Sequence, residues 1–215
     1  MSPNHSRRHK QILLLVETSR QYGRDIIAGV TQYVRENSTW NIYFEDRGLN
    51  EKVQANYDNW DGIIARSASD EMANSLKAWG GPLVELLHTN DATRIPDVMG
   101  DSATISEMAI EHFLERRIRH FAYFSLFSTW WSSMRCELFR QILNKRGFDC
   151  HVFETPAENV SDHPSPLIHW NSKVAKSLPL WLKSLPKPVG LLVTTDSYAM
   201  YVYEACYSLG IAIPE

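Results

Sequence analysis

The sequence predicts an α/β protein built from mainly parallel sheets in two consecutive lobes. Apolar runs of four to six residues alternate with longer amphipathic stretches, which is typical of β-α units. The same alternation begins again after a polar passage at residues 88–97. With 44% hydrophobic and 22% charged residues in a chain of 215, the composition is that of an ordinary soluble globular protein.

The first predicted β-α unit is the clearest. Residues 12–16 are continuously apolar, as a strand that is covered on both faces requires. A helix is predicted from about 21 to 37, because its apolar residues recur about every 3.6 positions and form one stripe. The rest of this lobe is predicted as strands at 41–46, 61–66 and 82–87, with helices near 51–59 and 69–79.

The second lobe repeats this order of elements. Its strands are predicted at 98–101, 121–126, 150–155 and 189–195, and its helices at 102–116, 132–147, 171–184 and 197–209. We therefore expect a flexible basic leader at 1–10, an N-terminal lobe at 11–97 and a C-terminal lobe at 98–215.

Charge and cysteine content exclude several classes of protein. Twenty-two Lys and Arg against 25 Asp and Glu give a net charge of −3, which provides no overall basic field for binding nucleic acid. The three cysteines lack CxxC spacing, so neither a disulfide framework nor a zinc site is predicted. The apolar run after the charged N-terminus is too short for a signal peptide or a membrane span. We expect a cytoplasmic protein without a membrane contact.

Charged residues follow several of the predicted strands. In open α/β sheets, ligands bind at the carboxyl ends of the strands, and two lobes in series suggest a cleft between them. Carboxylate and guanidinium groups form directional hydrogen bonds to a polyol or an anion, and aromatic faces cover the apolar side of a sugar ring. The residues in these positions are Glu17, Arg66, Asp101 and Asp196, with Asp46 and Arg47 after the second strand.

Motifs of common enzyme classes are absent from the sequence. It contains no GxxxxGK[ST], GxGxxG, HExxH or GxSxG. The nearest glycine pair, Gly23 and Gly29, falls within a predicted helix and does not form a phosphate loop. Glu17 and Asp196 could serve as an acid and base pair across a cleft, but the same residues equally suit acceptors for a bound ligand.

No metal or cofactor is predicted. His163 and His169 are six apart in a Pro-rich stretch and are interpreted as solvated histidines. His112 and His120 flank the end of a predicted helix, where a cation is favoured by the helix dipole.

Several stretches together resemble one known family. ILLLVETSRQYGRDIIAGVTQYVRE, IYFEDRGL and DGIIAR resemble the N-terminal sensor of the xylose-operon regulators known as XylR. The resemblance continues, in matching order, in MGDSATISEMAIEHFLERRIRHFAYF, WWSSMRCELFRQILNKRGF and WLKSLPKPVGLLVTTDSYAMYVYEAC, and covers about residues 11–215. Those sensors are LacI- and GalR-like, periplasmic-binding-protein-like domains that precede an AraC-type DNA-binding domain.

The resemblance implies a two-lobed, type I periplasmic-binding-protein-like fold and a non-enzymatic, allosteric sugar sensor. The implied ligand is D-xylose or another pentose, and the implied assembly is a homodimer that reaches DNA only through a region this chain lacks. The alternatives are a small α/β sugar-processing enzyme with Glu17 or Asp196 as base, and an exported sugar-binding protein.

The family's ligand contacts carry over to particular positions. Arg135 in WSSMR stands where LacI-type sensors direct an arginine at sugar hydroxyls, and Trp131 offers a face for ring stacking. Asp101 stands at the family's crossover segment, and Asp196 stands at the start of the last helix. Glu17 stands at the end of the first strand, and Tyr22 and Arg24 stand at the opening of the first helix.

Each of these residues also has a structural interpretation. The two arginines on predicted helices, Arg24 and Arg135, suit surface ion pairs, and Trp131 suits a core or hinge position. Asp101 and Asp196 precede or begin predicted helices, where aspartate is a favoured N-cap.

The sequence departs from the family pattern at two places. Arg117 stands where the family usually has a helix-ending glycine, a position that often requires a left-handed conformation. The chain also stops at Glu215, before the family's next strand and its return crossings. We therefore expect a C-terminally incomplete domain with an uncovered sheet edge and uncovered helix faces.

Overall fold

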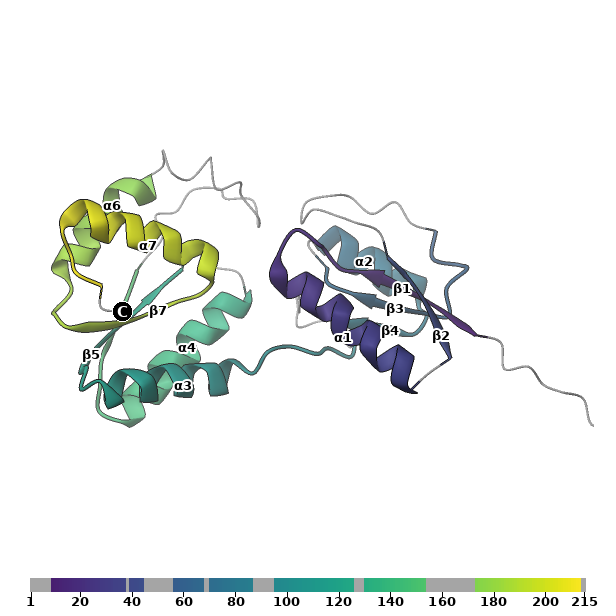
Figure 1. Ribbon diagram of the computed structural model, residues 1–215, viewed down its shortest axis with the longest axis horizontal. Helices are drawn as coiled ribbons and strands as arrows, with labels where there is room; N and C mark the ends of the chain where they lie inside the picture. Colours follow the sequence, from purple (N-terminus) through teal and green to yellow (C-terminus); the bar gives the residue numbers. More distant parts are fainter. Residues whose placement is uncertain are drawn as a thin grey trace, which may run out of the picture. The chain divides into compact units, whose positions relative to one another are not determined.

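The computed structural model describes residues 9–37, 39–44, 56–67, 70–86, 95–125, 130–153 and 173–213. The chain divides into two compact units, Met1–Gly100 and Asp101–Glu215, each with its own sheet and helices (Figure 1).

The first unit contains a four-stranded parallel sheet in the order β2-β1-β3-β4. Ile12 in the central strand pairs with Ile42 on one side and with Gly62 on the other. Its elements in chain order are β1 (Lys10–Leu15), α1 (Gln21–Asn37), β2 (Trp40–Phe44), β3 (Gly62–Ala65), α2 (Asp70–Trp79) and β4 (Leu83–Glu85).

The core of this unit forms around β1, whose apolar run continues into Val16. Leu14 and Val16 are fully buried. Helix α2 packs on one face of the sheet, where its Leu76 joins Leu13, Leu15 and Ile63 in a single apolar cluster. Both faces of the central strand are therefore buried up to its carboxyl end.

The second unit contains a three-stranded parallel sheet in the order β6-β5-β7. Its helices lie on both faces, α3 and α4 on one side and α6 and α7 on the other (Figure 1). The elements are α3 (Ser102–Glu115), β5 (His120–Phe124), α4 (Trp130–Lys145), β6 (Cys150–Val152), α6 (Lys173–Ser184), β7 (Val189–Val193) and α7 (Asp196–Leu209).

Alternate residues of β5 supply the two apolar clusters of the second unit. Phe121 and Tyr123 point to the α3 and α4 side, and Ala122 and Phe124 to the α6 and α7 side. All four residues are at most 2% exposed. This continuous burial explains why the stretch reads as an unbroken apolar run in the sequence.

The predicted alternation of strand and helix is confirmed, but the strand predicted at 98–101 is wrong. Of the helix predicted near 51–59, residues 51–55 lie outside the described residues, and residues 56–59 are not helical. In the described part of the helix predicted near 51–59, the side chain of Asn56 accepts a hydrogen bond from the backbone N–H of Asp58 at 2.9 Å, and a turn follows. Such a local bond competes with helix formation. No strand forms at 98–101; an isolated bridge joins Glu85 to Asp97, just before this segment, and the chain then enters the N-cap of α3 at Asp101.

The predicted left-handed residue at the end of α3 is confirmed. Arg117 has φ of 60°, and its N–H donates to the Leu114 carbonyl at 2.8 Å. The N–H of Ile118 donates to the Phe113 carbonyl at 3.0 Å, which completes a Schellman motif.

Asp46, Arg47, His163 and His169 lie outside the described residues. Within the described ranges, no helix has the length and apolar character needed to cross a membrane.

Candidate functional site

The carboxyl ends of β1 and β3 bring Glu17 and Arg66 together. Arg66 Nη1 lies 2.9 Å from Glu17 Oε1, and the two side chains are only 12% and 5% exposed. A buried ion pair is costly unless its remaining polar atoms are hydrogen-bonded. Among the described residues, neither carboxylate oxygen of Glu17 nor Arg66 Nε has a hydrogen-bond partner, although Arg66 Nη1 lies within ion-pair distance of Oε1. Buried polar atoms of both residues are thus left without hydrogen bonds.

The first turn of α1 lies against this pair. The Arg66 guanidinium is 5.4 Å from the centroid of the Tyr22 ring, within cation–π range, and Tyr22 is 51% exposed. Arg24 instead supports the loop before α1. Its Nη1 donates to the Thr18 carbonyl at 2.8 Å and its Nη2 to the Gln21 side chain at 2.9 Å.

Gly23 permits the close approach of α1 to Glu17. A Cβ at this position would lie 1.9 Å from the Glu17 carbonyl oxygen, so no other residue fits without moving the helix. In the sequence, Gly23 stands out only as half of a glycine pair that does not form a phosphate loop. The signal that could have identified it is a glycine at the start of a helix that follows a buried strand.

Ser67 and Glu85 also lie at this edge of the sheet and were missed. The buried Glu85 carboxylate accepts hydrogen bonds from the Ser67 N–H at 2.9 Å, from the Ser67 hydroxyl and from the Leu86 N–H at 3.1 Å. These bonds fix the turn that carries Arg66. A glutamate inside the apolar run PLVELL was the available signal, because a charged residue in a buried strand requires partners.

In the second unit, Arg135 reaches from α4 to the carboxyl end of β7. Its Nη1 donates to the Thr194 carbonyl at 3.0 Å, and its guanidinium carbon lies 5.7 Å from the centroid of the Trp131 ring. Arg135 Nε is buried and has no hydrogen-bond partner in the described part of the chain. The structure thus places Arg135 and Trp131 beside the strand end that leads to Asp196.

Asp196 is exposed and begins helix α7, after the N-cap residue Thr195. The Thr195 side chain makes no cap hydrogen bond, and its buried Oγ1 finds no partner among the described residues. Asp196 therefore follows, in the chain, a residue whose buried hydroxyl has no partner among the described residues.

Asp101 acts as the N-cap of α3. Its Oδ1 accepts from the N–H groups of Thr104 at 3.0 Å and Ala103 at 2.9 Å, and its Oδ2 from the Thr104 hydroxyl at 2.8 Å. The bonds from Thr104, backbone first, lower the pKa of Asp101 from its usual value, because they favour the charged form. Asp101 thus has the capping role that the sequence analysis gave as its structural interpretation.

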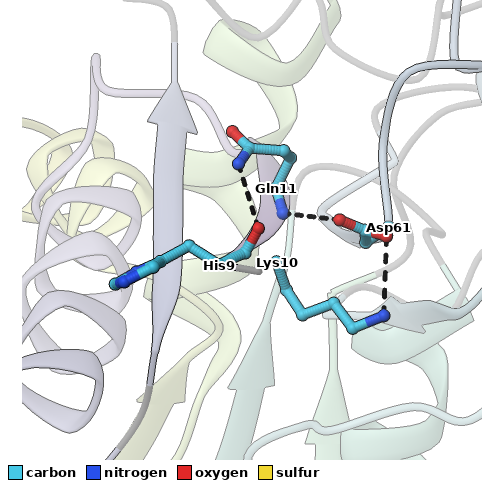
Figure 2. A network of polar contacts seen from close by, with 4 residues as sticks. All are labelled: His9, Lys10, Gln11 and Asp61. Carbon is cyan, nitrogen blue, oxygen red and sulfur yellow. Dashed lines mark hydrogen bonds and ion pairs between the residues drawn. The ribbon is translucent and has the colours of Figure 1, made fainter. Parts of the chain in front are cut away.

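Figure 2 shows polar contacts at the other end of the first sheet, where its strands begin. Asp61 accepts from the Gln11 N–H at 2.9 Å and lies 3.5 Å from Lys10 Nζ, while Gln11 Nε2 donates to the His9 carbonyl at 3.1 Å. A mainly apolar hollow of about 740 Å³ lies at these strand starts, between residues such as Trp40 and Val84. It is separate from the carboxyl edge that carries Glu17 and Arg66.

Metal chemistry has no support in the described ranges, where no cluster of three or more His, Cys, Asp or Glu side chains could hold an ion. Burial raises the pKa of the Cys150 thiol to about 12, so this cysteine is held in its unreactive form.

Two family models match consecutive parts of the chain. Residues 11–99 match the XylR N-terminal domain, and residues 110–215 match the periplasmic binding protein-like domain. Together the two matches follow the division into two compact units.

Curated relatives carry one name. The xylose operon regulatory protein of Haemophilus influenzae is 26% identical, with 95% of this chain and 53% of the relative covered. The protein of the same name from Escherichia coli K12 is also 26% identical, with 98% and 53% covered. The chain therefore spans about half the length of the curated relatives that it matches.

Solved structures show the same fold. The structure of the xylose-binding transcription activator xylR has a TM-score of 0.77 at 23% identity and covers 97% of this chain and 52% of that protein. A periplasmic binding protein/LacI transcriptional regulator from Alkaliphilus metalliredigens, complexed with D-xylulofuranose, has a TM-score of 0.62 at 16% identity, with 95% and 74% covered.

Proposed function

The chain belongs to the periplasmic-binding-protein-like domains of the XylR type, and from this premise we propose that it binds a small neutral sugar without chemical conversion. D-xylose or another pentose is the proposed ligand, since the relatives are xylose operon regulators. The resemblance and the fold class stated from the sequence are confirmed by the comparisons.

The unsatisfied atoms of the Glu17–Arg66 pair carry this proposal. Hydroxyl groups of a ligand can donate to the Glu17 carboxylate and accept from Arg66 Nε–H, the buried atoms that lack hydrogen-bond partners among the described residues. The ion pair is neutral overall, so it suits an uncharged polyol better than a sugar phosphate, whose charge would be left uncompensated. The Tyr22 ring supplies a face for the apolar side of the sugar.

The second unit offers further proposed contacts. Arg135 Nε and Thr195 Oγ1 are a buried donor and a buried hydroxyl without partners among the described residues, and Asp196 and Trp131 lie beside them in the chain. Arg24 and Asp101 are proposed as supports for their local backbone, because their polar atoms already bind it.

As a sensor, the chain would report ligand by a shift between two conformational states. Such a shift requires that the sugar bind one state more tightly than the other, because equal affinity changes no population. Transmission to DNA-binding helices, a homodimeric assembly and a cytoplasmic location are parts of this proposal, since a regulator must reach DNA.

Calorimetry with D-xylose tests the proposal. We expect saturable binding that falls roughly 10- to 100-fold in Glu17→Gln, because a hydrogen bond to a charged group contributes about 1.5–3 kcal/mol. Glu107→Gln makes the same chemical change at an exposed position on α3 and serves as the control, with unchanged affinity. The absence of binding to any pentose, or full affinity in Glu17→Gln, would refute it.

The proposal also states that no reaction occurs. The same samples, incubated with labelled pentose, are expected to return the sugar unchanged by chromatography. Turnover that disappears in Glu17→Gln or in Asp196→Asn would support the enzyme alternative instead.

A further inference from the structure

A buried tyrosine closes a ring of polar contacts behind Arg135. The hydroxyl of Tyr123, in β5, donates to the Ser132 carbonyl in the first turn of α4 at 3.0 Å. The Thr194 hydroxyl, at the end of β7, lies 3.1 Å from the Tyr123 oxygen. Arg135, one turn after Ser132 on the same helix, donates to the Thr194 carbonyl at 3.0 Å. The three elements α4, β5 and β7 are thereby joined at their ends.

The hydrogen bonds of this network run in one direction. The Ser132 carbonyl can only accept, so the Tyr123 proton is directed to it. The Thr194 hydroxyl can donate to the Tyr123 oxygen or to the Phe124 carbonyl at 2.9 Å, and that carbonyl already accepts the Thr194 N–H at 3.0 Å. A chain from Thr194 to Tyr123 to Ser132 therefore satisfies every group.

The Tyr123 phenol keeps its proton at neutral pH. Tyr123 is 2% exposed, and burial raises the pKa of its phenol above the usual value. The phenol is therefore a fixed donor, and its link to the helix does not change with pH in the physiological range.

Among the described residues, two polar links connect the N-terminal part of α4 with the end of β7. One is the bond from Arg135 itself, and the other is the Tyr123 hydroxyl. The Ser132 hydroxyl also bonds to Ser125 at 2.8 Å, but that bond leads to the end of β5. Without the phenol, the guanidinium would have to hold the helix to β7 as well as bind a ligand.

We propose that Tyr123 is a positioning residue for Arg135, which it holds at the carboxyl end of β7 in the orientation that a sugar hydroxyl requires. The inference rests on the proposed function, because it assigns Arg135 to the ligand. Tyr123 touches no ligand in this account and acts only through the helix turn and the strand end.

Tyr123→Phe is the variant that isolates this role. In this variant the Thr194 hydroxyl can turn to the Phe124 carbonyl, so no buried donor loses its acceptor. The aromatic ring at position 123 still packs against Phe139. We expect the variant to fold and to bind D-xylose about tenfold more weakly by calorimetry. Tyr57→Phe, at a buried tyrosine of the first unit, is the control and is expected to bind as the wild type does.

A double-mutant cycle separates positioning from a general structural effect. In an Arg135→Met background, Tyr123→Phe is expected to change the affinity less than about twofold, since its effect acts through the missing guanidinium. A full penalty in that background, or wild-type affinity in Tyr123→Phe alone, would overturn the inference.

Spectroscopy tests the inference independently of the ligand. In a ¹⁵N spectrum of the arginine Nε–H groups, the Arg135 signal is assigned by its loss in Arg135→Met. We expect it to shift in Tyr123→Phe and to stay in place in Tyr57→Phe. If the wild type binds no sugar, the proposed function fails, and an unshifted Arg135 signal would separately overturn the positioning role.

Discussion

Arg117 closes α3 in a left-handed conformation, with φ of 60°, whereas Gly147 closes α4 at φ of 78° in the same arrangement of hydrogen bonds. A left-handed conformation costs a non-glycine residue about 1–2 kcal/mol, part of which glycine loses again through its greater freedom in the unfolded chain. Arg117→Gly is therefore expected to raise the free energy of unfolding by about 0.5–1 kcal/mol in urea titrations.

Two control variants show whether this gain comes from the backbone. Arg117→Ala keeps a Cβ and is expected to leave the stability near that of the wild type. Gly147→Ala is expected to lower it by about 1 kcal/mol. An equal gain in Arg117→Ala and Arg117→Gly would mean that the arginine side chain, and not the dihedral angle, is unfavourable.

The positions of single residues in the candidate site were predictable only where one local sequence rule, such as directly following an apolar strand, was sufficient. Glu17 and Arg66 follow apolar strands directly, so their place at the sheet edge could be inferred from the sequence. Their mutual ion pair, and the bonds of Ser67 to Glu85, depend on strand order and register, which spacing does not encode. Tyr123 was read as one more apolar residue, because nothing local shows that its hydroxyl has partners on two other elements.

At the level of elements, the long periodic helices and the buried strands were predicted best. Helix α1 begins and ends at the predicted residues, Gln21 and Asn37. Short segments have a weaker periodic signal, and at residues 56–59, where no helix forms, the Asn56 side chain bonds to the Asp58 N–H instead. The exact ends of strands were also missed, since pairing with a neighbour decides where a strand stops.

Helix α1 offers a direct test of how an element is seated. A Cβ at Gly23 would meet the Glu17 carbonyl at 1.9 Å, whereas a Cβ at Gly29, on the exposed side of the same helix, meets nothing within 4 Å. Gly23→Ala is expected to destabilise the protein by about 1–3 kcal/mol as the helix is pushed outward. Gly29→Ala is expected to stabilise it by up to about 1 kcal/mol through helix propensity alone.

Urea unfolding followed by circular dichroism measures both changes, and calorimetry with D-xylose measures their effect on binding. The displaced helix carries Tyr22 away from Arg66, so Gly23→Ala is also expected to weaken sugar binding, while Gly29→Ala leaves it unchanged. Equal behaviour of the two variants would show that α1 is not seated on Glu17 as described.

On the scale of the whole chain, fold class was the most predictable property. Both sheets are entirely parallel, so consecutive strands need crossover connections, most of which are helices in the described chain, and the sequence alternates accordingly. That pattern is shared by many functions, and the family became visible only through the order of several weak motifs. At 26% identity to the curated relatives, the order is kept while most individual residues differ.

Charge over the whole chain leads to a final prediction. The net charge is −3, and the residues of the first unit that are proposed to bind the sugar, Glu17 and Arg66, are a buried pair of opposite charges. A neutral sugar that binds such groups releases few counterions, and buried pairs are weakly screened. We therefore expect the dissociation constant for D-xylose to change less than about twofold between about 50 and 500 mM NaCl. Calorimetry at a series of salt concentrations measures this, and a steep loss of affinity with salt would indicate that the site is built for an anionic ligand.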